Sequence, residues 1–120
     1  MKVGHVRDNL PRIVLALPTL DGMVNVEFIV DTGFDGELAL PLTVMRQIDA
    51  EFATERLIRL AEGGIRRRAC YEVNLDWNDE ERLTEILLLE GNPLLGSELL
   101  IGSLVHIEMT NGGEVTIEPL

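Results

Sequence analysis

The feature that most constrains the fold is an alternation of apolar and polar residues in two separate segments. Residues 24–30 and 68–77 each place apolar side chains at every second position. A period of two is typical of β-strands with one buried face, and helices do not produce it. The alternating apolar residues are Val24, Val26, Phe28 and Val30 in the first segment and Ala69, Tyr71, Val73, Leu75 and Trp77 in the second. The sequence therefore predicts a protein built mainly from strands.

Further strand signals and turn signals extend this prediction along the chain. Hairpin turns are predicted at Asp21-Gly22, at Glu62-Gly63-Gly64 and at Asn111-Gly112-Gly113, where residues that favour turns separate apolar runs. Additional strands are predicted in residues 12–17, 36–40, 58–61, 83–89, 105–109 and 115–117, and helices in residues 41–50 and 97–101. We expect an all-β fold with seven or more short strands and one or two short helices, in a single domain spanning residues 1–120.

The composition limits the classes of function. The chain has 120 residues and a net charge of −11, which disfavours nucleic acid as a partner. A single cysteine, Cys70, excludes an intrachain disulfide and a cysteine metal cluster. The N-terminal residues lack the apolar core of a signal peptide, and no apolar stretch is long enough to span a membrane. The expectation is a soluble cytoplasmic protein with no membrane partner.

The main candidate for chemistry is Asp31-Thr32-Gly33, which directly follows the apolar residues Phe28-Ile29-Val30. Placing an acid at the end of a buried strand costs free energy, so we expect such an acid to have a function. About sixty residues later comes Leu94-Leu95-Gly96-Ser97, and Gly63-Gly64 lies between the two motifs. Their order and spacing resemble the retropepsin-like family of aspartic proteases, and the resemblance covers nearly the whole chain.

The resemblance implies a closed acid-protease barrel and an aspartic endopeptidase that needs neither a metal nor an organic cofactor. Two carboxylates must share one proton, and one Asp31 per chain implies a homodimer acting on a peptide or protein substrate. By the same analogy Thr32 braces the catalytic loop, and Gly33 allows close backbone approach. Gly63 and Gly64 form a mobile flap over the substrate, and residues 94–96 pack behind the loop.

Three departures from the family keep other functions open. Phe34 stands where the family usually has a small residue and is expected to shape the substrate cleft. Asp35 occupies the position of an acid that contacts the substrate, but Ser97 replaces the arginine that usually pairs with it. The C-terminal segment is longer and ends in a hairpin. The alternatives are an inactive module that binds a partner through its cleft or dimer surface, and a protease that is latent until it dimerises.

The remaining charged and titratable residues are given ordinary structural interpretations. Arg66-Arg67-Arg68 reads as a solvated face, or as a basic entrance to the cleft if the flap is placed correctly. Residues 76–81 lack the spacing of a calcium loop and read as a charged hairpin tip. His5 and His106 lack metal-ligand spacing, and Cys70 lies on the polar face of its strand with no catalytic role expected.

Overall fold

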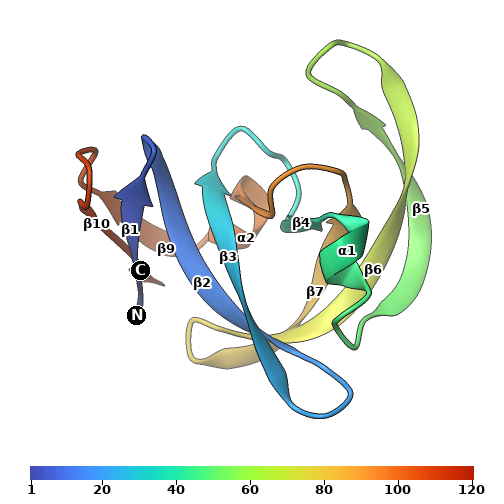
Figure 1. Ribbon diagram of the computed structural model, residues 1–120, viewed down its shortest axis with the longest axis horizontal. Coiled ribbons are helices and arrows are strands. Elements are labelled where there is room, and N and C mark those ends of the chain that lie inside the picture. The colour runs from blue at the N-terminus through green and yellow to red at the C-terminus, as the bar shows by residue number, and fades with distance from the viewer.

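The computed structural model describes all 120 residues and contains ten strands and two four-residue helices (Figure 1). In chain order the elements are β1 (Lys2–Arg7), β2 (Leu10–Pro18), β3 (Met23–Asp31), β4 (Leu38–Leu40), α1 (Leu42–Met45), β5 (Glu51–Arg59), β6 (Ile65–Trp77), β7 (Glu80–Leu88), β8 (Leu94–Gly96), α2 (Ser97–Leu100), β9 (Ser103–Ile107) and β10 (Glu114–Pro119). The expectation of a mainly-β protein with one or two short helices is confirmed.

All ten strands belong to one sheet in the order β5-β6-β7-β4-β8-β3-β2-β1-β10-β9. Neighbouring strands are antiparallel except for two parallel pairs, β3 with β8 and β4 with β7. The sheet does not close, since β5 and β9 each pair on one side only, so the prediction of a closed barrel is wrong. Closure depends on which strands become neighbours, and the alternation of side chains within a strand does not encode that.

The predicted turns explain most of the local connections. Asp21-Gly22 lies in the hairpin between β2 and β3, and Asn111-Gly112-Gly113 lies between β9 and β10, as predicted. The charged hairpin tip is also confirmed. It is a two-residue turn in which Asn78 and Asp79 both have positive φ, 50° and 66°. Such turns match the twist of the adjoining strands, and Asn and Asp are common in them because these residues tolerate positive φ.

The N-terminal segment forms a strand that the sequence analysis did not predict. β1 pairs with β2 on one side and with the C-terminal strand β10 on the other. Its connection to β2 is a second tight turn, in which Asp8 and Asn9 have φ of 54° and 63°. The two ends of the chain therefore lie side by side in the sheet (Figure 1).

The helical predictions are confirmed at one place and too long at the other. Residues 97–100 form α2, as expected, but the helix predicted for residues 41–50 ends at Met45. The strand predicted at 58–61 begins instead at Glu51 and ends at Arg59. Its alternation is weak because neither face of β5 is buried, so periodicity cannot locate it. Neither helix is long and apolar enough to cross a lipid bilayer.

A single cluster of 20 buried residues forms the core. Alternate residues of β2 and β3 contribute one wall, with Ile13 opposite Phe28 and Leu15 opposite Val26. The predicted faces of residues 24–30 and 68–77 are largely confirmed, since most of their alternating apolar residues belong to this cluster or pack against it. Cys70 departs from the expectation, because it is buried although it lies on the opposite face of its strand.

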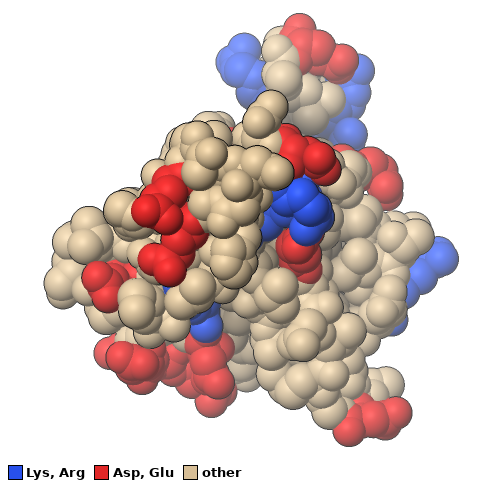
Figure 2. Space-filling model, turned by 60° about the vertical axis from the view of Figure 1, so that its left-hand side comes forward, with Lys and Arg blue, Asp and Glu red and all other residues tan.

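The β5–β6 hairpin projects from this core as an arm, which we define as residues 51–70 (Figure 1). None of the nine residues of β5 is buried. Gly63 lies in the turn at the tip with φ of 94°, a conformation that L-residues rarely adopt. Figure 2 shows the arm projecting from the body, with both basic and acidic side chains at its end.

Candidate active site

Asp31 is the last residue of β3, where the strand leaves the core. Residues 28–30 are buried, whereas Asp31 is half-buried. Its Oδ1 accepts a hydrogen bond of 2.9 Å from the N–H of Gly33, and its carbonyl accepts one of 3.2 Å from the N–H of Phe34. These bonds form a tight turn that holds the carboxylate at the start of the loop. Aspartate favours such turns for local reasons as well, so the turn alone does not identify a catalytic acid.

The second sequence motif lies directly behind this loop. β8 pairs in parallel with β3, so that Asp31 is in register with Gly96, and β4 pairs with β8 on the other side. The N–H groups of Gly96 and Ser97 donate 2.8 Å hydrogen bonds to the carbonyls of Glu37 and Phe34. The predicted packing of residues 94–96 behind the loop is therefore present.

Glycine is required at position 96 by this packing. A Cβ atom on Gly96 would lie 2.2 Å from the carbonyl oxygen of Gly36 and 2.6 Å from the ring of Phe34. Both contacts are shorter than real Cβ contacts, and one is to backbone. A Cβ atom on Gly36 would likewise lie 2.5 Å from the Phe34 ring, so the ring occupies the space between Gly36 and Gly96. The large residue that departs from the family pattern is accommodated by glycines on either side of it.

Ser97 supports the loop through its backbone contacts and leaves Asp35 unpaired. The hydroxyl of Ser97 donates a 3.1 Å hydrogen bond to the carbonyl of Phe34, which supplements the bond from its own N–H. Asp35 is exposed and forms no salt bridge, and neither does Asp31. Thr32 is also exposed, and its hydroxyl has no hydrogen-bond partner within the chain.

A cleft of about 840 Å³ opens beside the loop, between residues 33–38, the arm and β7. Of the predicted site residues, Gly33, Phe34 and Asp35 line it. Asp31 and Thr32 do not, and neither do the two flap glycines. The arm lines the cleft through residues 56–61 near its middle and through Cys70 at its base. The structure thus brings the loop and the arm to one cleft but leaves Gly63 and Gly64 at the outer tip.

Charged residues that the sequence analysis missed line the same cleft. Glu37 is buried, pairs with Arg82 and accepts a 2.9 Å hydrogen bond from the N–H of Glu85. Glu85 in turn pairs with Arg56 at 2.5 Å, a hydrogen bond that raises the pKa of the Arg56 guanidinium. No local signal in the sequence predicts this chain of charges, because its members come from β5, from β7 and from the residue before β4.

Cys70 also lines the cleft, and it is 1% exposed. Burial raises the pKa of its thiol, an effect that the hydrogen bond with Arg56 partly opposes. A thiol with a raised pKa is a poor nucleophile at neutral pH because little of it is ionised. The absence of a catalytic role for Cys70 stays a prediction.

The three consecutive arginines lie on the arm and do not line the cleft. Arg66 lies 3.8 Å from Glu62, and Arg67 lies 3.9 Å from Glu55. Both ion pairs are exposed and contribute little to the stability of the fold. Arg66 and Arg67 are exposed on opposite faces of β6, and Arg68 is partly buried, so the three arginines do not form a basic entrance to the cleft.

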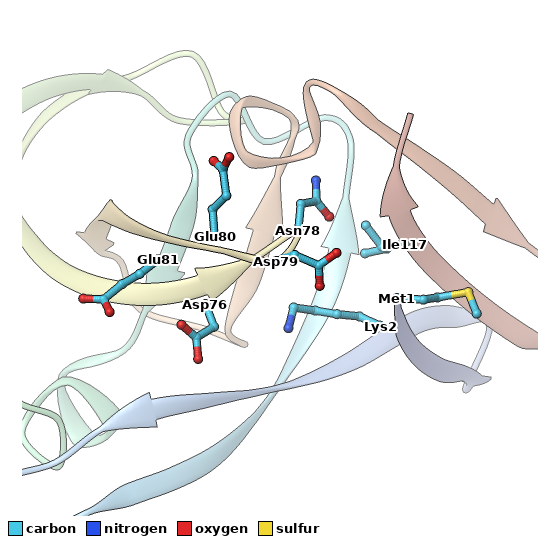
Figure 3. A pocket seen from close by; sticks show the side chains of 8 residues that line it. All are labelled: Met1, Lys2, Asp76, Asn78, Asp79, Glu80, Glu81 and Ile117. Atoms are coloured by element: carbon cyan, nitrogen blue, oxygen red, sulfur yellow. The ribbon is translucent and has the colours of Figure 1, made fainter.

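A second hollow of about 470 Å³ lies where the β6–β7 turn approaches the N-terminal strand. Asp76, Asp79 and Lys2 line it, and in Figure 3 the Lys2 side chain extends toward the two acids. The Lys2 ammonium also lies 5.8 Å from the centre of the Trp77 ring. No group of three or more histidine, cysteine or acidic side chains is arranged to hold a metal ion anywhere in the chain.

Comparison of the chain with protein-family models, with curated proteins and with solved structures finds no match. The geometry described above is thus the basis for assigning a function. In chemical terms the site offers one half-buried carboxylate per chain on a braced loop, beside a cleft with a mixed polar and apolar lining.

Proposed function

We propose that this protein is an aspartic endopeptidase of the retropepsin-like type, active as a homodimer. The observation that carries the proposal is the Asp31 loop, which is hydrogen-bonded to β8 from behind and opens on a cleft in front. The resemblance of the two motifs to that family supports the same assignment. The closed barrel of that family is not part of the proposal, because this sheet stays open.

The chemistry requires a second carboxylate, which a second copy of the chain supplies. Two carboxylates this close cannot both ionise, so the pair shares one proton and titrates as a unit. One Asp31 then takes a proton from the attacking water, and the other donates a proton to the carbonyl oxygen of the peptide. The cleft orients the substrate beside the pair, with Phe34 and Asp35 against it.

The arm provides the movable cover in this proposal. Its residues 56–61 already line the cleft, and its β5 strand has no buried residue to hold it in one position. Closure of such a hairpin excludes water from the reacting groups. Gly63 and Gly64 then contribute to the flexibility of the tip, while residues nearer the base of the arm contact the substrate.

The test is cleavage of a peptide library between about pH 4 and about pH 7, the range in which a shared carboxylate pair works. Replacing Asp31 by Asn removes the proton acceptor, and we expect cleavage to fall by at least about a hundredfold. Asp21→Asn is the matched control, since it removes an exposed acid in the turn that precedes β3, away from the Asp31 end of that strand. Cleavage by Asp31→Asn at the wild-type rate would exclude the proposal.

A second candidate function is a binding module without turnover. The bulk of Phe34 between Gly36 and Gly96, and the absence of an ion pair at Asp35, favour it. This function predicts a folded protein that retains peptides in fluorescence-polarisation titrations but releases no cleavage products at any protein concentration. Any cleavage that depends on Asp31 would rule it out.

A further inference from the structure

The sheet has two outer strands, β5 and β9, whose free edges differ in chemistry. Free edges of strands pair readily with other chains, and proteins usually protect them with charges or bulges. β5 has both kinds of protection, with four charged residues and a register shift between Phe52 and Thr54. β9 has the sequence Ser-Leu-Val-His-Ile, with no acid, lysine or arginine, and its pairing with β10 is regular.

The register identifies the backbone groups on the free edge of β9. Glu108 N–H donates to the carbonyl of Glu114, and Leu120 N–H donates to that of Gly102. Hydrogen-bonded pairs alternate along an antiparallel ladder, so Leu104 and His106 bond to β10. The backbone groups of the three remaining residues face away from the sheet. These residues are Ser103, Val105 and Ile107.

The partial exposure of β9 also indicates that a neighbouring strand is missing at its free edge. Its inward-facing residues Val105 and Ile107 pack against the core but remain partly exposed. On the adjacent strand β10, the inward-facing Val115 and Ile117 are 0% exposed. The core is thus completely covered at β10 and only partly covered at β9. A further strand beside β9 would complete the cover.

We infer that β9 pairs in antiparallel fashion with β9 of a second copy of this chain, about a two-fold axis at Val105. The strand suits its own copy, because a pair centred on Val105 places Ser103 opposite Ile107 and Leu104 opposite His106. Each free N–H then meets a free carbonyl of the other copy. This inference rests on the proposed function in one respect, since a homodimer is what a single Asp31 per chain requires.

The charge of the protein favours this strand over other surfaces for self-association. Two copies with a net charge of −11 each repel one another, and close contact is least costly where charges are few. β9 supplies an uncharged segment, and the exposed apolar residues Ile101 and Met109 flank it. The resulting interface is isologous, with the same residues contributed by each copy.

The experiment compares two double variants that differ only at position 106. In Leu104→Lys/His106→Lys each copy places a lysine opposite a lysine of the other, whereas in Leu104→Lys/His106→Glu each lysine faces a glutamate. Position 104 is opposite Glu118 of the same chain, and both variants place the same new lysine there, so the isolated subunits differ only at position 106, which is opposite Thr116. We expect the first pair of substitutions to raise the dissociation constant of the dimer by roughly tenfold or more, and the second to restore association.

Sedimentation over a wide range of protein concentration measures the dissociation constant of each variant, and circular dichroism verifies that each variant is folded. Val14→Lys is the control, because it adds a lysine at an exposed residue on the outer face of β2, away from β9. Its dissociation constant should equal that of the wild type. Dimers of Leu104→Lys/His106→Lys that are as tight as the wild type would overturn the inference, and so would equal loss of association in both double variants.

The same samples separate this inference from the proposed function. In one outcome the wild type dimerises without cleaving peptides, while the lysine–lysine variant loses association and the lysine–glutamate variant regains it. That result would support the β9 interface and contradict the protease. A dimer that cleaves peptides and is unaffected by either double variant would support the protease and place its interface elsewhere. A wild type that is monomeric at every concentration, including one whose β9 edge instead binds a strand of another protein, would overturn the inference.

Discussion

At one end of the sheet, β5 pairs only with β6 and none of its nine residues is buried. At the other end, β10 lies between β1 and β9, and its Val115 and Ile117 are completely buried. The arm is therefore held mainly by backbone hydrogen bonds and exposed ion pairs. The terminal strands belong to the hydrophobic core.

This difference separates two tasks within one sheet. Segments with few buried apolar contacts open at low free-energy cost, and movable covers of active sites are drawn from such segments. Strands that complete the core open only with global unfolding. An arm that closes over the cleft and a terminal region that supports a fixed subunit interface are consistent with this division.

The largest expected effect tests the contrast in burial directly. Ile117→Ala on β10 leaves a cavity in the core and should lower the free energy of unfolding by about 2–5 kcal/mol. Leu57→Ala on β5, where the side chain is 70% exposed, should change it by less than about 0.5 kcal/mol. Urea unfolding at one fixed protein concentration measures both. Similar losses in the two variants would show that the arm contributes to the core.

A smaller effect is expected where a charge is buried at the base of the arm. Arg82→Ala leaves the buried Glu37 carboxylate without its ion-pair partner and should cost about 1.5–3 kcal/mol. Arg56→Ala breaks an exposed pair with Glu85 and should cost less than about 1 kcal/mol. A double-mutant cycle with Glu37→Gln isolates the first interaction. Equal costs for the two arginines would contradict the distinction between a pair with a buried carboxylate and a pair with an exposed one.

The smallest effect concerns the pH dependence of an exposed ion pair between Arg7 of β1 and Glu27 of β3. The hydrogen bond from Arg7 lowers the pKa of the Glu27 carboxyl. A lowered pKa in the folded state stabilises the protein above the unfolded pKa of about 4.3, and this contribution disappears as the pH falls through the folded value. Wild type should therefore be slightly more stable than Glu27→Gln at neutral pH. Urea titrations of both proteins at neutral pH and in strong acid measure this difference in the free energy of unfolding. A difference that persisted unchanged in strong acid would contradict the assignment.

Local features of the fold were predictable because short-range physics produces them. The alternation in residues 24–30 and 68–77 predicts which side chains of β3 and β6 face the core. Asp21-Gly22 and Asn111-Gly112-Gly113 predict their hairpins through backbone conformations that these residues favour. The position of Asp31 at the end of a buried strand, with residues 94–96 behind it, was predictable from two motifs.

Long-range features were not predictable in the same way. β5 has weak alternation because it is exposed on both faces, so its start at Glu51 was missed. The ion pairs that line the cleft join residues from β5, from β7 and from the position before β4, and nothing near Glu37 or Arg82 in the sequence indicates the other. The buried environment of Cys70 was missed for the same reason.

The sequence by itself determined the class of the fold, the inward faces of its main strands and the loop that carries Asp31. These follow from the geometry of a single strand or turn, which a few neighbouring residues specify. Only the tertiary structure decided that the sheet stays open, that β1 lies between β2 and β10, and that β9 keeps an uncharged free edge. Pairing of distant strands depends on the free energy of the whole chain, because every alternative neighbour competes for the same backbone hydrogen bonds and the same core.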